Sequence, residues 1–318
     1  MQTAIFCFSE NGKRIAEELR EKLSGETIVR FKEHDDLGTL FRESDALIFI
    51  CATGIAVRLV APYLESKTTD PAILVIDDQG RNVISLLSGH IGGANDLARE
   101  IAKLIDATPV ITTATDGAGK FSCDSWAVKH NCEISSMDAA KEISAKILES
   151  DIKISSEYTL PKCLPGGLIP GEGDIFIGIH KNPAKLCLIP KIVTVGIGCR
   201  RDTPATKIID TVKDVLSENY IDGKAICGIA SIDIKKDEEG LLACAEYFSV
   251  PIKFYNAQTL SDIQGEFEES EFVKETTGVG NVCERAAVCE GGRLIVGKTA
   301  KDGITGAVAV KDWRVDFE

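Results

Sequence analysis

The chain alternates short apolar runs with amphipathic segments, and this alternation restricts its fold more than any other feature. Apolar runs of strand length occupy residues 3–8, 46–53, 72–77 and 108–115. The segment after the first run places Ile15, Leu19 and Leu23 at helical spacing, and residues 82–87 follow a turn as a predicted hairpin strand. Buried strands that alternate with amphipathic helices are typical of an α/β sheet covered on both faces.

The alternation weakens in the middle of the sequence and then returns. KCLPGGLIPGEGD, at residues 162–174, is rich in proline and glycine, and KIVTVGIGC restarts the strand-helix pattern at residue 191. We therefore predict an N-terminal α/β domain over residues 1–120, a small middle domain or linker over 121–190, and a C-terminal α/β domain over 191–318. The expected fold class is α/β, with two Rossmann-like three-layer domains joined by a small α/β middle segment.

Charge and cysteine usage exclude several classes of function. A net charge of −13 makes the whole molecule repel nucleic acid and anionic membranes, so neither is an expected partner. The 11 cysteines form no C-x-x-C pair and the 4 histidines are scattered, so we predict no metal site of the protein's own. No run is long enough for a spanning helix and the first residues do not resemble a signal peptide, which predicts a cytoplasmic protein.

Four glycine-rich loops stand at strand ends or before helices and offer free backbone N–H groups. Such positions bind carboxylate or phosphate, and two of the loops also carry arginines in or directly after them. We interpret Thr203 and Pro204 as the N-cap and first residue of a helix, and Asn281 with Glu284 as a capping box. The candidate substrate-binding residues of these loops are Gly54, Arg58, Gly89, Gly92, Gly93, Gly196, Gly198, Arg200, Arg201, Gly280, Asn281, Glu284 and Arg285.

The loop SLLSGHIGGAND, at residues 85–96, presents His90 between glycines and is the strongest candidate for a catalytic histidine. We interpret Asp116 and Asp302, each beside a glycine, as turn residues. The first strand-helix turn holds one glycine where the dinucleotide fingerprint needs three, and no phosphate-binding P-loop motif occurs. A nicotinamide- or flavin-dependent oxidoreductase is therefore disfavoured.

These loops resemble a known family. CATGIAVRLVAPYLESKTTDPAILVIDDQGRNVISLLSGHIGGANDLAREIA resembles the amino-terminal domain of the CbiG family of cobalt-precorrin-5A hydrolases, which act in anaerobic cobalamin biosynthesis. VGIGCRRDTPATKI, GVGNVCERAA and KDGITGAVAV resemble its carboxy-terminal domain. The resemblance implies that water opens the δ-lactone of a cobalt-bound tetrapyrrole, that acetaldehyde is released, and that cobalt-precorrin-5B is formed.

The resemblance also gives the candidate residues expected roles. We expect His90 to be the general base, Asn95 or Asp96 to orient it or the water, and the N–H groups of Gly92 and Gly93 to serve the oxyanion. Arg58, Arg200, Arg201 and Arg285 would then clamp the substrate's acetate and propionate groups. Cobalt enters inside the substrate, so we expect no cofactor, and neighbouring enzymes of the pathway are the only protein partners that the resemblance suggests.

A second class of function fits the same features. A non-catalytic tetrapyrrole carrier of the same pathway would need the anion-binding loops and the arginines but no base. His90 discriminates the two hypotheses, because its replacement would leave a carrier's affinity intact.

Overall fold

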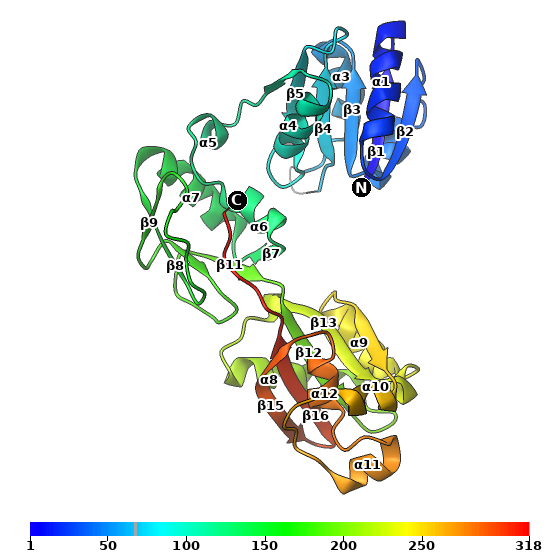
Figure 1. The fold of residues 1–318 in the computed structure, drawn as a ribbon, viewed down its shortest axis with the longest axis vertical. Helices are drawn as coiled ribbons and strands as arrows, with labels where there is room; N and C mark the ends of the chain where they lie inside the picture. Colours follow the sequence, from blue (N-terminus) through cyan, green and yellow to red (C-terminus); the bar gives the residue numbers. More distant parts are fainter. Residues whose placement is uncertain (67–68, 318) are drawn as a thin grey trace. The chain divides into compact units, whose positions relative to one another are not determined.

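The computed structural model describes residues 1–66 and 69–317. Lys67, Thr68 and Glu318 lie outside the described residues, and so does the predicted domain end at residue 318. By its contacts the chain divides into two compact units, Met1–Val128 with Ser144–Ser150, and Lys129–Ile143 with Asp151–Glu318. The first unit contains one sheet and the second contains two (Figure 1). The domain boundaries near 120 and 190 stay a prediction.

The first unit is built on a six-stranded sheet in the order β2-β1-β3-β4-β5-β6. Its strands are β1 (Gln2–Cys7), β2 (Glu26–Phe31), β3 (Ala46–Ile50), β4 (Ala72–Ile76), β5 (Asn82–Leu87) and β6 (Thr108–Val110). The helical segments are α1 (Glu10–Lys22), α2 (Leu37–Glu43), α3 (Thr53–Val60), η1 (Ala61–Tyr63), α4 (Ala94–Leu104), α5 (Ala114–Gly117) and α6 (Cys123–Lys129). The first four strands in this order are parallel, whereas β5 runs antiparallel to β4 and β6 runs parallel to β5.

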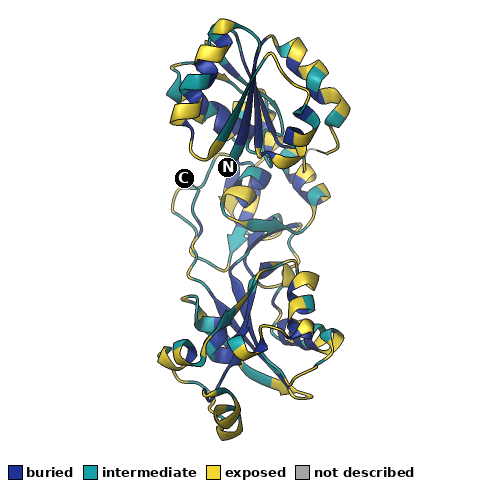
Figure 2. Ribbon diagram, turned by 90° about the vertical axis from the view of Figure 1, so that its right-hand side faces the viewer, coloured by how far each residue is buried: buried dark blue, intermediate teal, exposed yellow. Residues whose placement is uncertain are grey.

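Alternating side chains of the strands explain the three layers of this unit. Ile5 and Ile48 pack with α1 and α4 on one face, while Phe6 and Phe49 pack with α2 and α3 on the other. Strands β1, β3 and β4 are therefore buried on both sides and form the dark centre of the unit (Figure 2). The predicted strand over residues 82–87 and its hairpin with the preceding strand are both confirmed.

The second unit contains two five-stranded sheets. The middle sheet, in the order β7-β11-β10-β8-β9, is formed by β7 (Cys132–Ile134), β8 (Ile152–Ser156), β9 (Leu168–Pro170), β10 (Ile175–Ile177) and β11 (Leu186–Pro190). Helix α7 (Met137–Glu149) lies between β7 and β8 in the sequence. The third sheet, in the order β14-β13-β12-β16-β15, is formed by β12 (Val193–Gly198), β13 (Ile226–Ile232), β14 (Ile252–Tyr255), β15 (Arg293–Lys301) and β16 (Ile304–Val310). Its helical segments are α8 (Ala205–Glu218), η2 (Gly223–Ala225), η3 (Asp233–Lys235), α9 (Glu239–Tyr247), α10 (Ala257–Asp262), α11 (Glu271–Thr277) and α12 (Cys283–Val288).

Helices cover both faces of the third sheet, so the predicted α/β fold class is confirmed. Ile208 of α8 and Leu241 of α9 join the main core on one face, and α12 packs on the other. Helix α12 packs so closely on β12 at Gly196 that a side chain at this position would collide with the Cys283 carbonyl. None of the helices in the described ranges is long and apolar enough to span a membrane.

One predicted helix start is wrong by a residue. Pro204 is the N-cap of α8, which begins at Ala205. Thr203 does not cap the helix because its hydroxyl donates to the Arg200 carbonyl at 2.7 Å and its N–H to Glu238.

Candidate active site

The direction of two strands brings the catalytic candidates together. The end of β5 lies beside the start of β4, since Leu87 pairs with Ile73. Strand β6 is parallel to β5, so the loops that follow these two strands leave the same edge of the sheet. The first loop carries His90, and the second ends at Thr113, the N-cap of the short helix α5 that contains Asp116.

His90 lies between two carboxylates. Its Nε2 is 3.1 Å from Oδ2 of Asp116, and its Nδ1 is 3.2 Å from Oδ2 of Asp124, at the start of α6. The exposed fractions of the three side chains are 21%, 18% and 12% for His90, Asp116 and Asp124. Ionised carboxylates only accept hydrogen bonds, so this arrangement fits an imidazolium that donates from both ring nitrogens.

Asp116 is the most heavily hydrogen-bonded group of the cluster. Its Oδ2 accepts from Thr113 Oγ1 at 2.6 Å and from Asn95 Nδ2 at 2.9 Å, while Arg99 donates to Oδ1. Asn95 is buried and its own amide oxygen accepts from Ser85 at 2.7 Å. Asn95 therefore fixes Asp116 rather than the imidazole itself.

The mutual attraction of these groups shifts their pKa values in opposite directions. The hydrogen bond to Asp124 is the main cause that raises the pKa of His90, and it outweighs the opposing effect of burial. Burial opposes ionisation of Asp124, but hydrogen bonds from His90 and Ser122 outweigh it and lower its pKa to about 2. Burial likewise opposes ionisation of Asp116, whose pKa is nevertheless lowered by Thr113, Arg99 and His90.

The glycines of the His90 loop serve the loop's own packing. A side chain at Gly89 would come within 2.7 Å of the Asn95 amide oxygen, and one at Gly92 would collide with Ser88. Gly93 has φ +79° and is the N-cap of α4, a conformation that favours glycine. Its N–H donates to the His90 carbonyl at 2.9 Å, so the predicted oxyanion role of the Gly93 N–H does not hold in this structure.

Two sequence interpretations in this region need correction. Asp96 is one of the two residues expected to orient His90 or the water, but its side chain is 73% exposed and pairs with Arg99, and no contact joins it to His90 in the described residues. Asp116, interpreted as a turn residue, is a direct neighbour of His90. Asp124, Thr113 and Arg99 are not indicated by the sequence because their contacts with His90 and Asp116 depend on the fold, although the Thr-rich run TTATDG marks the end of a strand.

A cavity of about 270 Å³ opens beside this cluster. His90, Asn95 and Asp124 lie in its wall. The remaining lining residues are Ser85, Leu86, Leu87, Ser88, Gly89, Ile91, Thr112 and Thr113. Its volume lies just below the range of about 300–1,000 Å³ that is usual for small-molecule sites, so it fits part of a large ligand.

Gly54 and Arg58 are not brought to His90. They belong to α3, which follows the end of β3, and that end lies at the edge of the sheet opposite to the end of β5. Arg58 is exposed and donates to the Gly54 carbonyl at 3.2 Å. Any anion that Arg58 binds is therefore remote from the imidazole.

The second unit has a cavity of about 490 Å³ at the ends of the parallel strands β12 and β13. Five of the candidate substrate-binding residues line it, namely Gly198, Arg200, Arg201, Gly280 and Asn281. Ligands commonly bind at this position in open α/β sheets. Gly196 is not among the lining residues, since it faces α12.

Arg200 is the cation of this cavity best placed to bind an anion. Within the described ranges its guanidinium makes no hydrogen bond or ion pair, and Gly303 leaves room for it beside the β15–β16 turn. The other cations are paired, Arg201 with Asp237 at 3.1 Å, Lys235 with Glu238, and Lys298 with Glu268.

The remaining predicted residues of the second unit are structural. Arg285 donates to the carbonyls of Leu260, Ser261 and Ile263 and pairs with Glu269, so its guanidinium is already used and the clamp role is not supported. Glu284 is buried and accepts from the backbone N–H groups of residues 268 and 298. Only part of the predicted capping box is present. Asn281 Oδ1 accepts from the Glu284 N–H at 2.9 Å, but the N-cap of α12 is Val282, and the Glu284 carboxylate accepts from the side-chain amide of Asn281 and not from its backbone N–H.

The fold and the site together define a two-unit α/β protein with a proton-transfer cluster at one sheet edge and a strand-end cavity in the other unit. Residues 35–116 match the family described as cobalamin synthesis G N-terminal, and residues 193–309 match cobalamin synthesis G C-terminus. The chain belongs to the cobalamin synthesis G family.

Similar proteins extend over most of the chain. The cobalt-precorrin-5A hydrolase of Salmonella typhimurium is 35% identical over 95% of this chain and 95% of that protein. The protein of the same name from Priestia megaterium is 33% identical over 80% of this chain and 75% of its own length. The crystal structure of a cobalamin biosynthesis protein G homolog from Sulfolobus solfataricus is 26% identical, covers 98% of this chain and 97% of its own, and has a TM-score of 0.41.

Proposed function

We propose that the chain is a cobalt-precorrin-5A hydrolase, which opens the substrate's δ-lactone with water and releases acetaldehyde to give cobalt-precorrin-5B. The observation that carries this proposal is the 35% identity to a hydrolase of that name over nearly the full length of both chains. Cobalt enters as part of the substrate, so the scheme uses no cofactor of the protein's own. The cytoplasmic location remains a prediction.

The His90 cluster is the proposed site of proton transfer. A general base needs a neutral ring with a free lone pair, whereas both nitrogens of His90 face carboxylates and its pKa is raised. We therefore assign His90 the role of general acid in place of the base expected from the sequence. Asp124 orients the ring through Nδ1, as the carboxylate of a catalytic triad does.

The protons of lactone opening balance between His90 and solvent. The oxygen of water attacks the lactone carbonyl carbon, and the proton that water loses passes to solvent. When the ring C–O bond breaks, the departing alkoxide oxygen replaces Asp116 as the acceptor at Nε2 of imidazolium His90 and takes its proton. A proton from solvent then returns to the ring, which restores the starting charges.

Arg200 is the proposed binding group for a substrate carboxylate. Replacing it with glutamine should raise KM about tenfold or more with little change in kcat, because one charge-assisted hydrogen bond is lost from both ground and transition state. Arg201→Gln is the matched comparison, and its effect should be smaller because Asp237 already holds that guanidinium. Steady-state kinetics on the two variants measure this, and an unchanged KM for Arg200→Gln would remove the residue from the site.

The activity itself is tested by anaerobic incubation of the purified protein with cobalt-precorrin-5A. We expect trapped acetaldehyde in an amount that matches the loss of a two-carbon fragment from the corrinoid, followed by mass spectrometry. Tight binding of the substrate without acetaldehyde would contradict the hydrolase and point to the carrier.

A further inference from the structure

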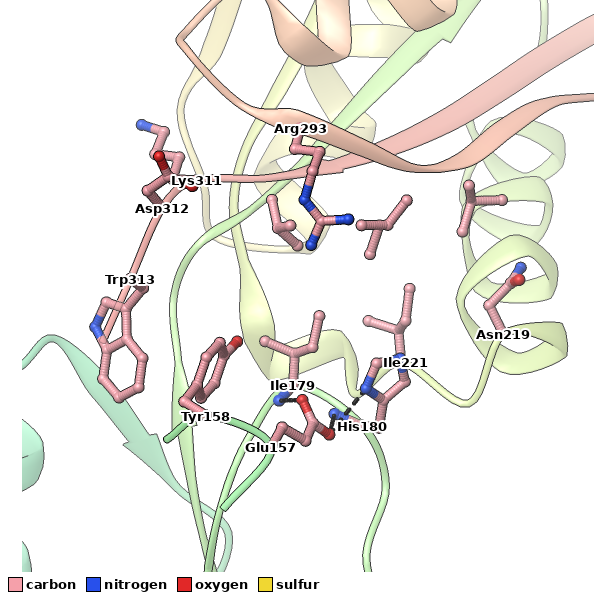
Figure 3. A pocket seen from close by; sticks show the side chains of 13 residues that line it. Glu157, Tyr158, Ile179, His180, Asn219, Ile221, Arg293, Lys311, Asp312 and Trp313 are labelled. Carbon is pink, nitrogen blue, oxygen red and sulfur yellow. Dashed lines mark hydrogen bonds and ion pairs between the residues drawn. The ribbon is translucent and has the colours of Figure 1, made fainter. Parts of the chain in front are cut away.

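The second unit contains another cavity, which shares no lining residue with the cavity at the ends of β12 and β13. It has a volume of about 400 Å³ and lies where residues after β8 and β10 meet the strands β15 and β16 (Figure 3). Its lining residues are Glu157, Tyr158, Ile179, His180, Asn219, Ile221, Arg293, Ile295, Val296, Val310, Lys311, Asp312 and Trp313. None of them belongs to the candidate active site.

Arg293 supplies a positive charge to this cavity. Its guanidinium points into the space above Tyr158 and Ile179 (Figure 3), and no hydrogen bond or ion pair to it occurs within residues 1–66 and 69–317. A guanidinium presents five N–H donors in a fixed plane that matches a carboxylate. The group is thus available to a ligand.

Tyr158 supplies a neutral donor close to this charge. Burial, together with the nearby Glu157, raises the pKa of its phenol to about 12, so the hydroxyl keeps its proton. The ring is fixed by an edge contact with Trp313 at a centroid distance of 4.9 Å. The phenol can therefore donate to an acceptor held by Arg293.

The carboxylate of Glu157 does not compete for Arg293. Oε2 accepts from the Ile179 N–H at 3.0 Å, and Oε1 accepts from the His180 N–H and lies 2.8 Å from His180 Nδ1. A side chain at Gly178 would come within 2.5 Å of this carboxylate group, so the glycine is required for the contact. Glu157 is a fixed part of the cavity wall.

The rest of the wall combines apolar side chains with the polar His180, Asn219, Lys311 and Asp312. Ile179, Ile221 and Val296 are buried, and Val310 closes the side formed by β16. A cavity with apolar walls and a few convergent polar groups is the usual form of a small-molecule site. We propose that this cavity binds a small organic carboxylate, with its charged group on Arg293 and Tyr158 and its apolar body against the isoleucines.

Phenylacetate and its uncharged analogue phenylacetamide test this proposal, since they share one apolar body and differ in charge. The chain contains two tryptophans, so in a Trp126→Phe background the emission of Trp313 reports occupation of the cavity. Calorimetry on the unmodified protein gives the affinity independently. We expect phenylacetate to change the emission and to bind about tenfold tighter than the amide, the difference that one charge-assisted hydrogen bond provides.

Three variants connect this preference to the cavity. Arg293→Gln should abolish the preference for the carboxylate. Asp312→Asn removes a negative charge from the lining, so the affinity for phenylacetate should stay the same or increase. Arg314→Gln is the matched control, because this arginine is 88% exposed and lies outside the lining, and the preference for the carboxylate should stay unchanged. Equal binding of acid and amide, no binding of phenylacetate at millimolar concentration, or an unchanged preference in Arg293→Gln would each overturn the proposal. None of these results depends on the hydrolase activity.

Discussion

Replacing His90 with glutamine is expected to lower kcat for lactone hydrolysis by about 10²- to 10⁴-fold, the usual contribution of general acid or base catalysis. Glutamine keeps a polar group of similar size in the loop but cannot carry the proton that the alkoxide oxygen needs. Acetaldehyde release under single-turnover conditions measures the chemical step directly. Substrate affinity should change little, because glutamine retains a polar side chain at this position.

His34→Gln is the control for this variant. It removes a histidine of the same unit that is exposed and contacts Phe8, so kcat should stay unchanged. His90→Gln leaves Asp116 and Asp124 without their shared partner, so its thermal unfolding must be compared with that of the wild type. A folded His90→Gln protein with nearly normal turnover would show that the proton donor lies elsewhere.

The strands were readable from the sequence because burial on two faces leaves a plain signal. The run ALIFI is apolar throughout and all its residues are buried in β3. The turn at residues 78–81 also marked the hairpin that pairs β4 with β5. These features depend on neighbours in the sequence, which is why local patterns were sufficient.

The composition of the site was harder to predict because it depends on strand direction. His90 and Asp116 are 26 residues apart and meet because β5 and β6 run parallel to each other and opposite to β4. The same reversal separates Arg58 from His90. A single sequence does not specify strand order, so Asp116 had only the appearance of a turn residue.

Arginines near glycine loops were a weak signal for anion binding. Arg200 and Arg285 occur in similar contexts, yet the guanidinium of the first has no partner among the described residues and that of the second donates to three backbone carbonyls. The carbonyls come from residues 22 to 25 positions away, which no local pattern indicates. Unused hydrogen-bonding capacity is therefore a property that only the folded chain reveals.

The pH dependence of kcat distinguishes an acid from a base at His90. The raised pKa means that the imidazolium form persists above pH 6.5, so an acid predicts a kcat that falls as pH rises through this raised value. A base predicts the opposite, a kcat that rises with pH in the same range. The same pairing adds folding stability at low pH that is lost as pH rises through the raised pKa.

Asp124→Asn should move the basic limb of this profile to lower pH, because it removes the largest cause that raises the pKa of His90. It should also reduce kcat, since the ring loses its orienting carboxylate. Asp96→Asn is the matched comparison, because that exposed carboxylate pairs with Arg99 and should leave the limb in place. Profiles of kcat for the three proteins measure this. If the basic limb of the Asp124→Asn profile stays at the same pH, His90 is not the group that titrates. If kcat of the wild type rises with pH in this range, His90 acts as a general base and not as an acid.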